Sequence, residues 1–458
     1  MQEEIMTQIK QQYEKKPLES WARMKELRRW RFKNNWEAQK NGNLVILSEH
    51  MGMKALWAGF GSLYYAVMSV SPYWTGAKRN LNEIYRLLEL TDSKGYGPQV
   101  CGALRLHLAH LFEGKTNVSP TGEVVIPDFA WQLNFCPQVS RLLHEAAKKL
   151  GIQYFYLEPI MGGDVKKSRD YIVAQLYENI DRAKKITGRE YDPELLVIAT
   201  RNELEVWKLF TEICVLNKAV PAPLCGRDLV SLTLIKTVMD LTPEAVEFYR
   251  GLKDEVKYRI ENKITSTGYE TARLYMDSFP WPFPRALKYP ETYGAVVVAG
   301  DHPFLDSQME QYEDGTWDVR KGFDEQIDSV KDMDSALKAL AWIWEAGLKV
   351  NRHNLHNWHI DETAAFPIGI AEQWHCDGMV LAWSADCFQQ MCFGKETKIL
   401  ADAKGIPNMI FSNILTDLRQ FDPDAFQKQF DTFLTKDLGL TKFEDRKNDG
   451  IKKEILQS

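Results

Sequence analysis

Short apolar runs that alternate with amphipathic helical segments are the feature that most restricts how this chain can fold. Residues 124–128 form an apolar run that ends in a polar loop, and residues 137–150 show helical periodicity that stops at Gly151. Residues 154–157 then form a second apolar run. A strand, a helix and a strand in this order predict a β-α-β unit, whose two strands lie parallel in one sheet.

The same alternation returns in the last third of the chain. It predicts strands at 295–299, 378–382 and 408–411, and helices at 334–346, 397–404 and 422–438. The last helix begins with Asp422 and Pro423, a typical N-cap followed by proline in the first turn. A second parallel sheet is therefore expected here.

Helical periodicity without strands fills residues 1–44 and 168–262, and a proline-rich passage at 279–284 marks a boundary. We therefore predict an α/β protein with two open parallel-sheet domains of the Rossmann or flavodoxin-like kind, similar in fold but diverged in sequence. The predicted units are a helical arm (1–44), a first α/β domain (45–167), a helical middle section (168–275) and a second α/β domain with a C-terminal helix (276–458).

Composition and charge exclude several classes of protein. The 458 residues are 45% hydrophobic, which supports large cores and excludes a disordered chain. Fifty-seven basic residues against 63 acidic ones give a net charge of −6, so nucleic acid is not an expected partner. The most basic stretch, Arg23 to Lys33, contains Glu26 and is interpreted as a solvated helix face, with an RNA-binding arm as the alternative.

The first residues carry charge throughout and contain no apolar core of a signal peptide. Residues 51–70 approach the length of a membrane span but include Lys54 and three glycines, so a buried helix or pair of strands is the preferred interpretation. We expect a cytoplasmic protein without a membrane partner.

Seven cysteines are scattered along the chain and do not form the framework of a disulfide-rich domain. Dinucleotide, P-loop, hydrolase-elbow and zincin motifs are all missing from the sequence. Cys136 and Cys387 instead follow predicted strands, and the carboxyl ends of parallel strands form the ligand crevice of such sheets. Two facing sheets would thus present these thiols and a third one to a shared iron–sulfur cluster, with buried structural cysteines as the alternative.

Several segments together resemble the superfamily of 2-hydroxyacyl-CoA dehydratases and class I benzoyl-CoA reductases, and the resemblance extends from about Lys16 to Leu438. The segments, individually weak, are specific in their order and spacing. They are 101–105 (CGALR), 127–129 (PDF) leading to Cys136, 171–176 (YIVAQL), 187–189 (TGR), 216–224 (LNKAVPAPL), Cys387, 405–407 (GIP) and 416–422 (TDLRQFD). Residues 16–21, 220–223 and 431–433 look most like the larger, B-type catalytic subunit of benzoyl-CoA reductase.

The resemblance implies a [4Fe–4S] cluster in the cleft between the domains, held by Cys101, Cys136 and Cys387. Cys392 is a rival for the third position. Cys376, just before a predicted strand, is expected to be a core residue, and Cys214 and Cys225 lie in the helical middle section. The family often has Asn-Arg shortly before its third cysteine, and this chain has Ser384-Ala385-Asp386 instead. The contacts next to Cys387 are therefore expected to differ from those of the family.

The activity implied is the ATP-dependent reduction of an aromatic acyl-CoA to a cyclic dienoyl-CoA. Such chemistry needs single electrons at low potential, which a cluster supplies and amino-acid side chains do not. The implied partners are a related smaller catalytic subunit, an iron–sulfur activator that hydrolyses ATP, and ferredoxin. The alternatives are an (R)-2-hydroxyacyl-CoA dehydratase subunit, a non-catalytic electron-transfer partner and, less well supported, a double-cubane reductase.

Candidate proton donors lie close to these cysteines. His107 and His110 follow Cys101, and Asp386 precedes Cys387. The histidines at 353, 356 and 359 have helical spacing and form a further candidate for metal binding or proton delivery, with a polar surface loop as the alternative.

Overall fold

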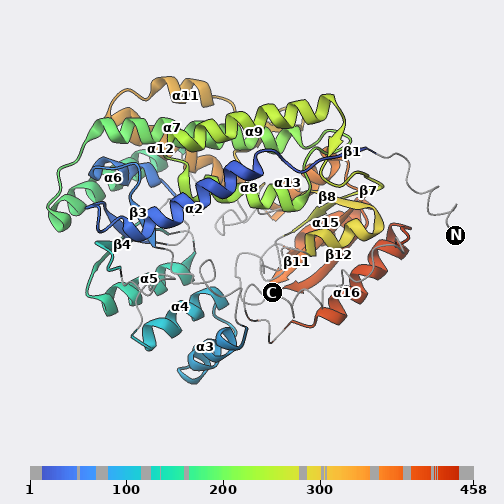
Figure 1. The fold of residues 1–458 in the computed structure, drawn as a ribbon, viewed down its shortest axis with the longest axis horizontal. Helices are drawn as coiled ribbons and strands as arrows, with labels where there is room; N and C mark the ends of the chain where they lie inside the picture. The colour runs from blue at the N-terminus through green and yellow to red at the C-terminus, as the bar shows by residue number, and fades with distance from the viewer. Residues whose placement is uncertain are drawn as a thin grey trace.

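A computed structural model gives the fold of the chain (Figure 1). It describes residues 13–48, 52–68, 81–114, 125–134, 136–158, 165–277, 286–300, 304, 307–350, 360–384, 394–413, 417, 419 and 421–442. Cys387, Cys392, Asp386 and the histidines at 353, 356 and 359 lie outside these residues.

The first sheet has four parallel strands in the order β3-β2-β4-β5. Helix α5 (Pro137–Leu150) connects β4 to β5, which confirms the predicted β-α-β unit. The helix ends at Gly151, whose φ of 69° is left-handed. The strands are β2 (Val45–Leu47), β3 (Ala66–Met68), β4 (Phe129–Leu133) and β5 (Gln153–Leu157).

The strand predicted at 124–128 is misplaced, because β4 begins only at Phe129. Pro127 has no amide hydrogen and cannot join the ladder of hydrogen bonds, and Ile126 is 55% exposed. Asp128, the residue before β4, instead binds the backbone of Val45 at the start of β2. Its carboxylate accepts the N–H of Val45 at 2.7 Å, and its own N–H donates to the Val45 carbonyl at 2.8 Å.

The second sheet is also parallel throughout, in the order β12-β11-β7-β8. Its strands are β7 (Ala272–Met276), β8 (Ala295–Ala299), β11 (Gly378–Ser384) and β12 (Asn408–Asn413). The predictions for β8, β11 and β12 are confirmed, whereas β7 was missed. The sequence of β7 includes Arg273, a charged residue that is not typical of a buried strand. The Arg273 side chain is nevertheless buried, because Glu270 and several backbone carbonyls accept its hydrogen bonds.

The two sheets share one topology. If the strands of each sheet are numbered along the chain, both have the order 2-1-3-4. In both, the direction of winding changes between the first and third strands, β2 and β4 in one sheet and β7 and β11 in the other. The mixed α/β class with parallel sheets is thus confirmed.

Four helices lie within residues 165–261, and one of them, α7, contributes to the cores of both sheets. Leu196, Ala199 and Leu204 belong to the apolar cluster on the first sheet, and Phe210 and Ile213 to a cluster on the second. In Figure 1, α7 and α9 run along one side of the molecule past both sheets. The helices are α6 (Val165–Thr187), α7 (Pro193–Leu216), α8 (Gly226–Met239) and α9 (Pro243–Glu261).

Helix α12 (Met333–Val350), which is late in the sequence, packs in the core of the first sheet. Its Leu337 and Leu340 share a cluster with Phe155 and Leu157 of β5. Smaller elements accompany it in this half of the chain. They are η4 (Ala286–Tyr293), β9 (Met309–Gln311), β10 (Trp317–Val319), α11 (Phe323–Ser329), α13 (Ile360–Gln373), α15 (Gly394–Ala403), α16 (Pro423–Thr432) and η6 (Phe433–Asp437).

The N-terminal arm is only partly helical. The helix predicted over 1–44 is wrong at β1 (Glu14–Lys15), which pairs in parallel with β6 (Ile264–Thr265), since Pro17 disfavours helix before it. Helix α2 extends over Trp21–Glu37. Residues 52–68, within the apolar stretch 51–70, contain η1 (Lys54–Phe60) and β3, and no helix among the described residues is long and apolar enough to cross a membrane.

Candidate functional site

Two of the three predicted cluster ligands occupy equivalent positions on neighbouring helices. Cys101 is the N-cap residue of α4 (Gly102–Phe112), and Cys136 is the N-cap residue of α5. Both thiols are half-buried and border the apolar cluster between these helices and the first sheet. The positive ends of two helix dipoles therefore lie beside the sulfur atoms, where they stabilise negative charge.

A hydrogen bond joins the beginnings of the two helices. The backbone N–H of Cys101 donates to Oε1 of Gln138 at 2.8 Å, and Gln138 is in the first turn of α5. This amide side chain therefore holds the backbone of one cysteine close to the helix start that carries the other.

The turn between β4 and α5 is fixed by further hydrogen bonds. The N–H of Asn134 donates to the carbonyl of Leu157 on β5 at 2.9 Å, and Ser140 Oγ donates to Asn134 Oδ1 at 2.6 Å. The Ser140 N–H donates to the carbonyl of Cys136 at 3.0 Å. These bonds set Cys136 at the carboxyl edge of the first sheet, beyond its third strand.

In the sequence, Cys387 follows a strand of the second sheet in the same way as Cys136 follows a strand of the first. Strand β11 ends at Ser384, so Cys387 is three residues beyond the third strand of its sheet, and Cys136 is three residues beyond Leu133 at the end of β4. Because the sheets have the same strand order, the two cysteines follow equivalent strands.

The carboxyl edge of the second sheet is tightly built. Asp277, the residue after β7, is fully buried, and its N–H donates to the Val380 carbonyl at 2.7 Å. At Gly300, directly after β8, a Cβ atom would lie 2.2 Å from the carbonyl oxygen of Met276, so the close approach requires glycine. The edge is thus compact on both sides of β7, including the side toward β11 where the winding of the sheet reverses.

The candidate proton donors on α4 differ in their surroundings. His107 is buried, and its Nε2 makes no hydrogen bond within the described part of the chain. Burial, with a smaller contribution from His110, lowers the pKa of His107 to about 3, so its imidazole is neutral at physiological pH. His110, one turn further along α4, is half-buried. Their role as donors stays a prediction.

The remaining described cysteines lie elsewhere. Cys214 and Cys225 are buried in the core of the second sheet, and Cys376 packs against it. Burial raises the pKa of the Cys225 and Cys376 thiols, which keeps them protonated. Since metal ligation needs thiolates, these thiols are poorly suited to hold iron.

Cys101 and Cys136 fit an iron–sulfur cluster by their chemistry. They are half-buried thiols, both at helix N-termini and both beside an apolar cluster, where bulk water is limited. Among the described residues no three His, Cys, Asp or Glu side chains gather as a metal site, and Cys387 is not one of these residues.

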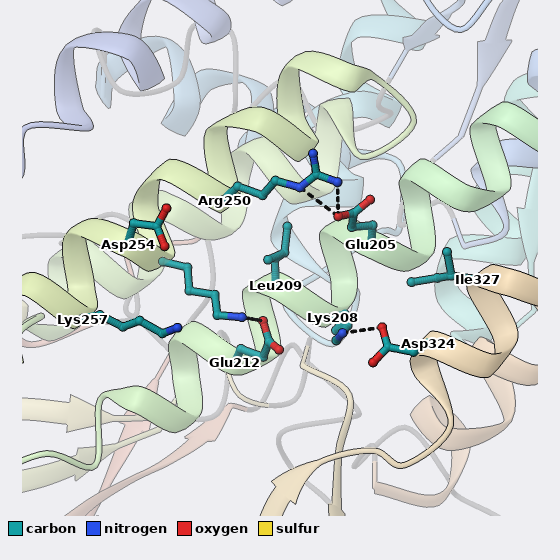
Figure 2. Close-up of a pocket in the computed structure, with 10 residues that line it drawn as sticks. Glu205, Lys208, Leu209, Glu212, Arg250, Asp254, Lys257, Asp324 and Ile327 are labelled. Atoms are coloured by element: carbon teal, nitrogen blue, oxygen red, sulfur yellow. Dashed lines mark hydrogen bonds and ion pairs between the residues drawn. The ribbon is translucent and has the colours of Figure 1, made fainter.

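A groove of about 440 Å³ lies on another face of the molecule, between α7, α9 and α11 (Figure 2). Its charges largely compensate one another: Lys208 Nζ is 2.5 Å from Asp324, Lys253 Nζ is 2.5 Å from Glu212, and Arg250 pairs with Glu205. The groove contains none of the predicted site residues.

Sequence reasoning missed the supporting residues of the cysteine site. Gln138 directly follows the Cys136-Pro137 pair at a helix start, which is a usable signal for a polar contact at that end. Arg105 and Asp417 occur in the sequence only within the motifs given above, yet they form a buried ion pair at 2.9 Å. Nothing in the sequence indicates this pairing over such a distance along the chain.

Comparison with curated proteins gives no match for this chain. A family model described as 2-hydroxyglutaryl-CoA dehydratase, D-component, matches residues 81–434. The matched range includes Cys101, Cys136 and Cys387 together with the helices and the turn described above. It covers well over half of the chain, and the family implies an enzyme of the 2-hydroxyacyl-CoA dehydratase type. The chain therefore belongs to the 2-hydroxyglutaryl-CoA dehydratase D-component family, within the 2-hydroxyacyl-CoA dehydratase superfamily.

Proposed function

We propose that this chain is the cluster-bearing catalytic subunit of an enzyme that transfers single electrons to an acyl-CoA thioester. The carrying observation is the pair of half-buried thiols, Cys101 and Cys136, at the starts of two hydrogen-bonded helices within the family match. With Cys387 as the third ligand, these residues would hold a [4Fe–4S] cluster. When bound, the cluster would supply electrons at a potential that side chains do not reach.

The chain's own residues would contribute placement and charge. The starts of α4 and α5 stabilise the negative charge of the thiolates, and Gln138 keeps the two starts together. His110 is the better placed of the two histidines to move a proton, because His107 is buried and neutral. Asp386, next to Cys387, is the second proposed donor.

The reaction we propose is reduction of an aromatic acyl-CoA, as in benzoyl-CoA reductases, supported by the resemblance of residues 16–21, 220–223 and 431–433 to B-type subunits. Dehydration of an (R)-2-hydroxyacyl-CoA is the second candidate, because the matched family is described as a dehydratase component. The proposed partners are a related smaller subunit, an ATP-hydrolysing iron–sulfur activator, and ferredoxin as electron source.

The cluster content of the protein is the first test of this proposal. Iron, acid-labile sulfide and the electron paramagnetic resonance (EPR) spectrum are measured on anaerobically prepared protein, on Cys136→Ala and, as a control, on Cys214→Ala. We expect about four irons per chain, lost in Cys136→Ala but not in Cys214→Ala. A folded wild-type protein without iron would refute the proposal.

The consumption of reductant then separates the two reactions, in the presence of activator and ATP. Stoichiometric consumption with benzoyl-CoA supports reduction. Catalytic amounts of reductant that sustain turnover of a 2-hydroxyacyl-CoA support dehydration. Iron without binding of either thioester would indicate an electron-transfer protein instead.

A further inference from the structure

Four charged side chains form a closed ring that joins two distant parts of the chain. Arg105 on α4 donates from Nη1 to Asp417 Oδ2 at 2.9 Å and from Nη2 to Asp92. Arg419 donates from Nη2 to Asp417 Oδ2 at 2.6 Å and is 3.0 Å from Asp92 Oδ2. We call Asp92, Arg105, Asp417 and Arg419 the charge ring.

The ring is most deeply buried where the two parts meet. The side chains of Arg105 and Asp417 are 0% and 2% exposed, whereas those of Asp92 and Arg419 are 34% and 25% exposed. Burial raises the pKa of Asp417, but hydrogen bonds from Arg419 and Arg105 more than offset this, and the pKa is below its usual value. The ring thus consists of two cations and two anions.

Acceptors from two segments converge on the Arg105 guanidinium. Helix α3 (Leu81–Ser93) offers the Leu88 carbonyl at 3.3 Å and Thr91 Oγ1 at 3.3 Å, in addition to Asp92. Asp417 comes from the segment after β12, an edge strand of the second sheet. A planar guanidinium with five donors serves these acceptors in one fixed arrangement, which a lysine ammonium cannot reproduce.

Arg105 is also one turn from the first cysteine. Its backbone N–H donates to the Cys101 carbonyl at 3.0 Å, so the two residues belong to the same first turn of α4. The anchored guanidinium therefore restrains the end of the helix that carries Cys101. Buried ion pairs stabilise a fold little compared with apolar side chains, and their best-supported benefit is a defined geometry.

We propose that the charge ring is a positioning device that ties the Cys101 end of α4 to the second sheet, so that Cys101 is held in the place where it ligates the cluster. The inference rests on the proposed function. Arg105, Asp417 and Arg419 are positioning residues, since they act through α4 and not by contact with the cluster.

The test uses the anaerobically prepared, iron-loaded protein and the variants Arg105→Lys and Asp417→Asn. Arg419→Lys is included because a partly exposed position tolerates change if the buried variants do not fold. The control is Arg86→Lys: Arg86 on α3 also binds two carboxylates, Glu83 and Glu113, but both belong to the same half of the chain. Folding is checked by circular dichroism and gel filtration, and the readouts are iron release to a chelator and the EPR spectrum.

We expect iron release about 10-fold faster in the ring variants, the scale seen when residues behind metal ligands are changed. The EPR line shape should also change, while Arg86→Lys should match the wild type. Folded ring variants with wild-type iron release and EPR spectrum, but a lower melting temperature, would overturn the inference and leave a purely structural ring. A wild-type protein without iron would refute the proposed function and this inference together, so the two failures are distinguishable.

Discussion

The backbone N–H of Cys101 and the side-chain Oε1 of Gln138 form a hydrogen bond of 2.8 Å between the first turns of two helices. Gln138 is two residues after Cys136, so the bond holds the Cys101 backbone next to the start of α5, which carries Cys136. It connects a residue proposed to bind iron with one that sequence reasoning did not single out.

Substitution of Gln138 by leucine removes this acceptor while retaining most of the side-chain volume. We expect a loss of about 1 kcal/mol in unfolding free energy, the usual net value of one hydrogen bond, and faster iron release from the loaded protein. Urea unfolding and release of iron to a chelator measure the two effects.

Gln373→Leu is the matched control for this substitution. Gln373, at the end of α13, also binds backbone: its side chain lies 2.7 Å from both the N–H and the carbonyl of Trp317 on β10, and it does not contact α4 or α5 through these bonds. Gln373→Leu removes two hydrogen bonds, so it should lose at least as much stability as Gln138→Leu and still retain its iron. Equal iron release from both variants would contradict a role for Gln138 in the site.

The thiols of the iron-free protein should differ in reactivity toward iodoacetamide. Cys101 and Cys136 are half-buried at helix starts and should be alkylated under native conditions. Cys214 and Cys225 are buried in a core and should react only in denaturant. Peptide mass spectrometry after timed alkylation checks this order, and native labelling of Cys214 at the rate of Cys136 would contradict it.

Stability should depend on pH through Glu203. Burial, and the nearby Asp240 carboxylate, raise the pKa of Glu203 to about 8, against opposing contributions from Lys54 and Lys236 and the Ala55 N–H. The folded chain therefore binds a proton at Glu203 between about pH 4.5 and 8 that the unfolded chain has released. Its unfolding free energy should fall as pH rises through this window and level off above it.

Glu203→Gln keeps the shape of the side chain without the titration. The difference in unfolding free energy between wild type and Glu203→Gln, measured by urea unfolding from pH 5 to 9, should grow in favour of the variant as pH rises. A constant difference over this range would show that Glu203 does not titrate there.

Loss of the buried cation Lys54 should be costly. Its Nζ lies 2.8 Å from Asp240, and the two side chains are 7% and 1% exposed. Lys54→Met would leave the Asp240 carboxylate buried without its counterion, so we expect destabilisation by about 3–5 kcal/mol in thermal or urea unfolding. The exposed pair of Lys338 with Asp334 is the control, and Lys338→Met should leave stability unchanged.

Local pattern was sufficient for much of the fold. Helix α5 is present at the predicted residues because its apolar spacing, its first-turn proline and the glycine after it all act within one segment. Strand β8 was equally clear, as an unbroken run of alanine and valine. The positions of Cys136 and Cys387 shortly after strands also follow from the sequence, whereas only the structure, with β7 added, makes each of these strands the third of its sheet.

Tertiary structure decided what depends on partners far along the chain. Strand β7 includes a buried arginine that is tolerated only because Glu270 and distant carbonyls satisfy it. The charge ring joins Arg105 to Asp417. Helix α12 packs on the first sheet, although in the sequence it lies between β8 and β11, two strands of the second sheet. Burial and ion pairing are properties of the assembled core, so local propensity carries no information about them, whereas the periodicity of each helix and strand is set by its own residues.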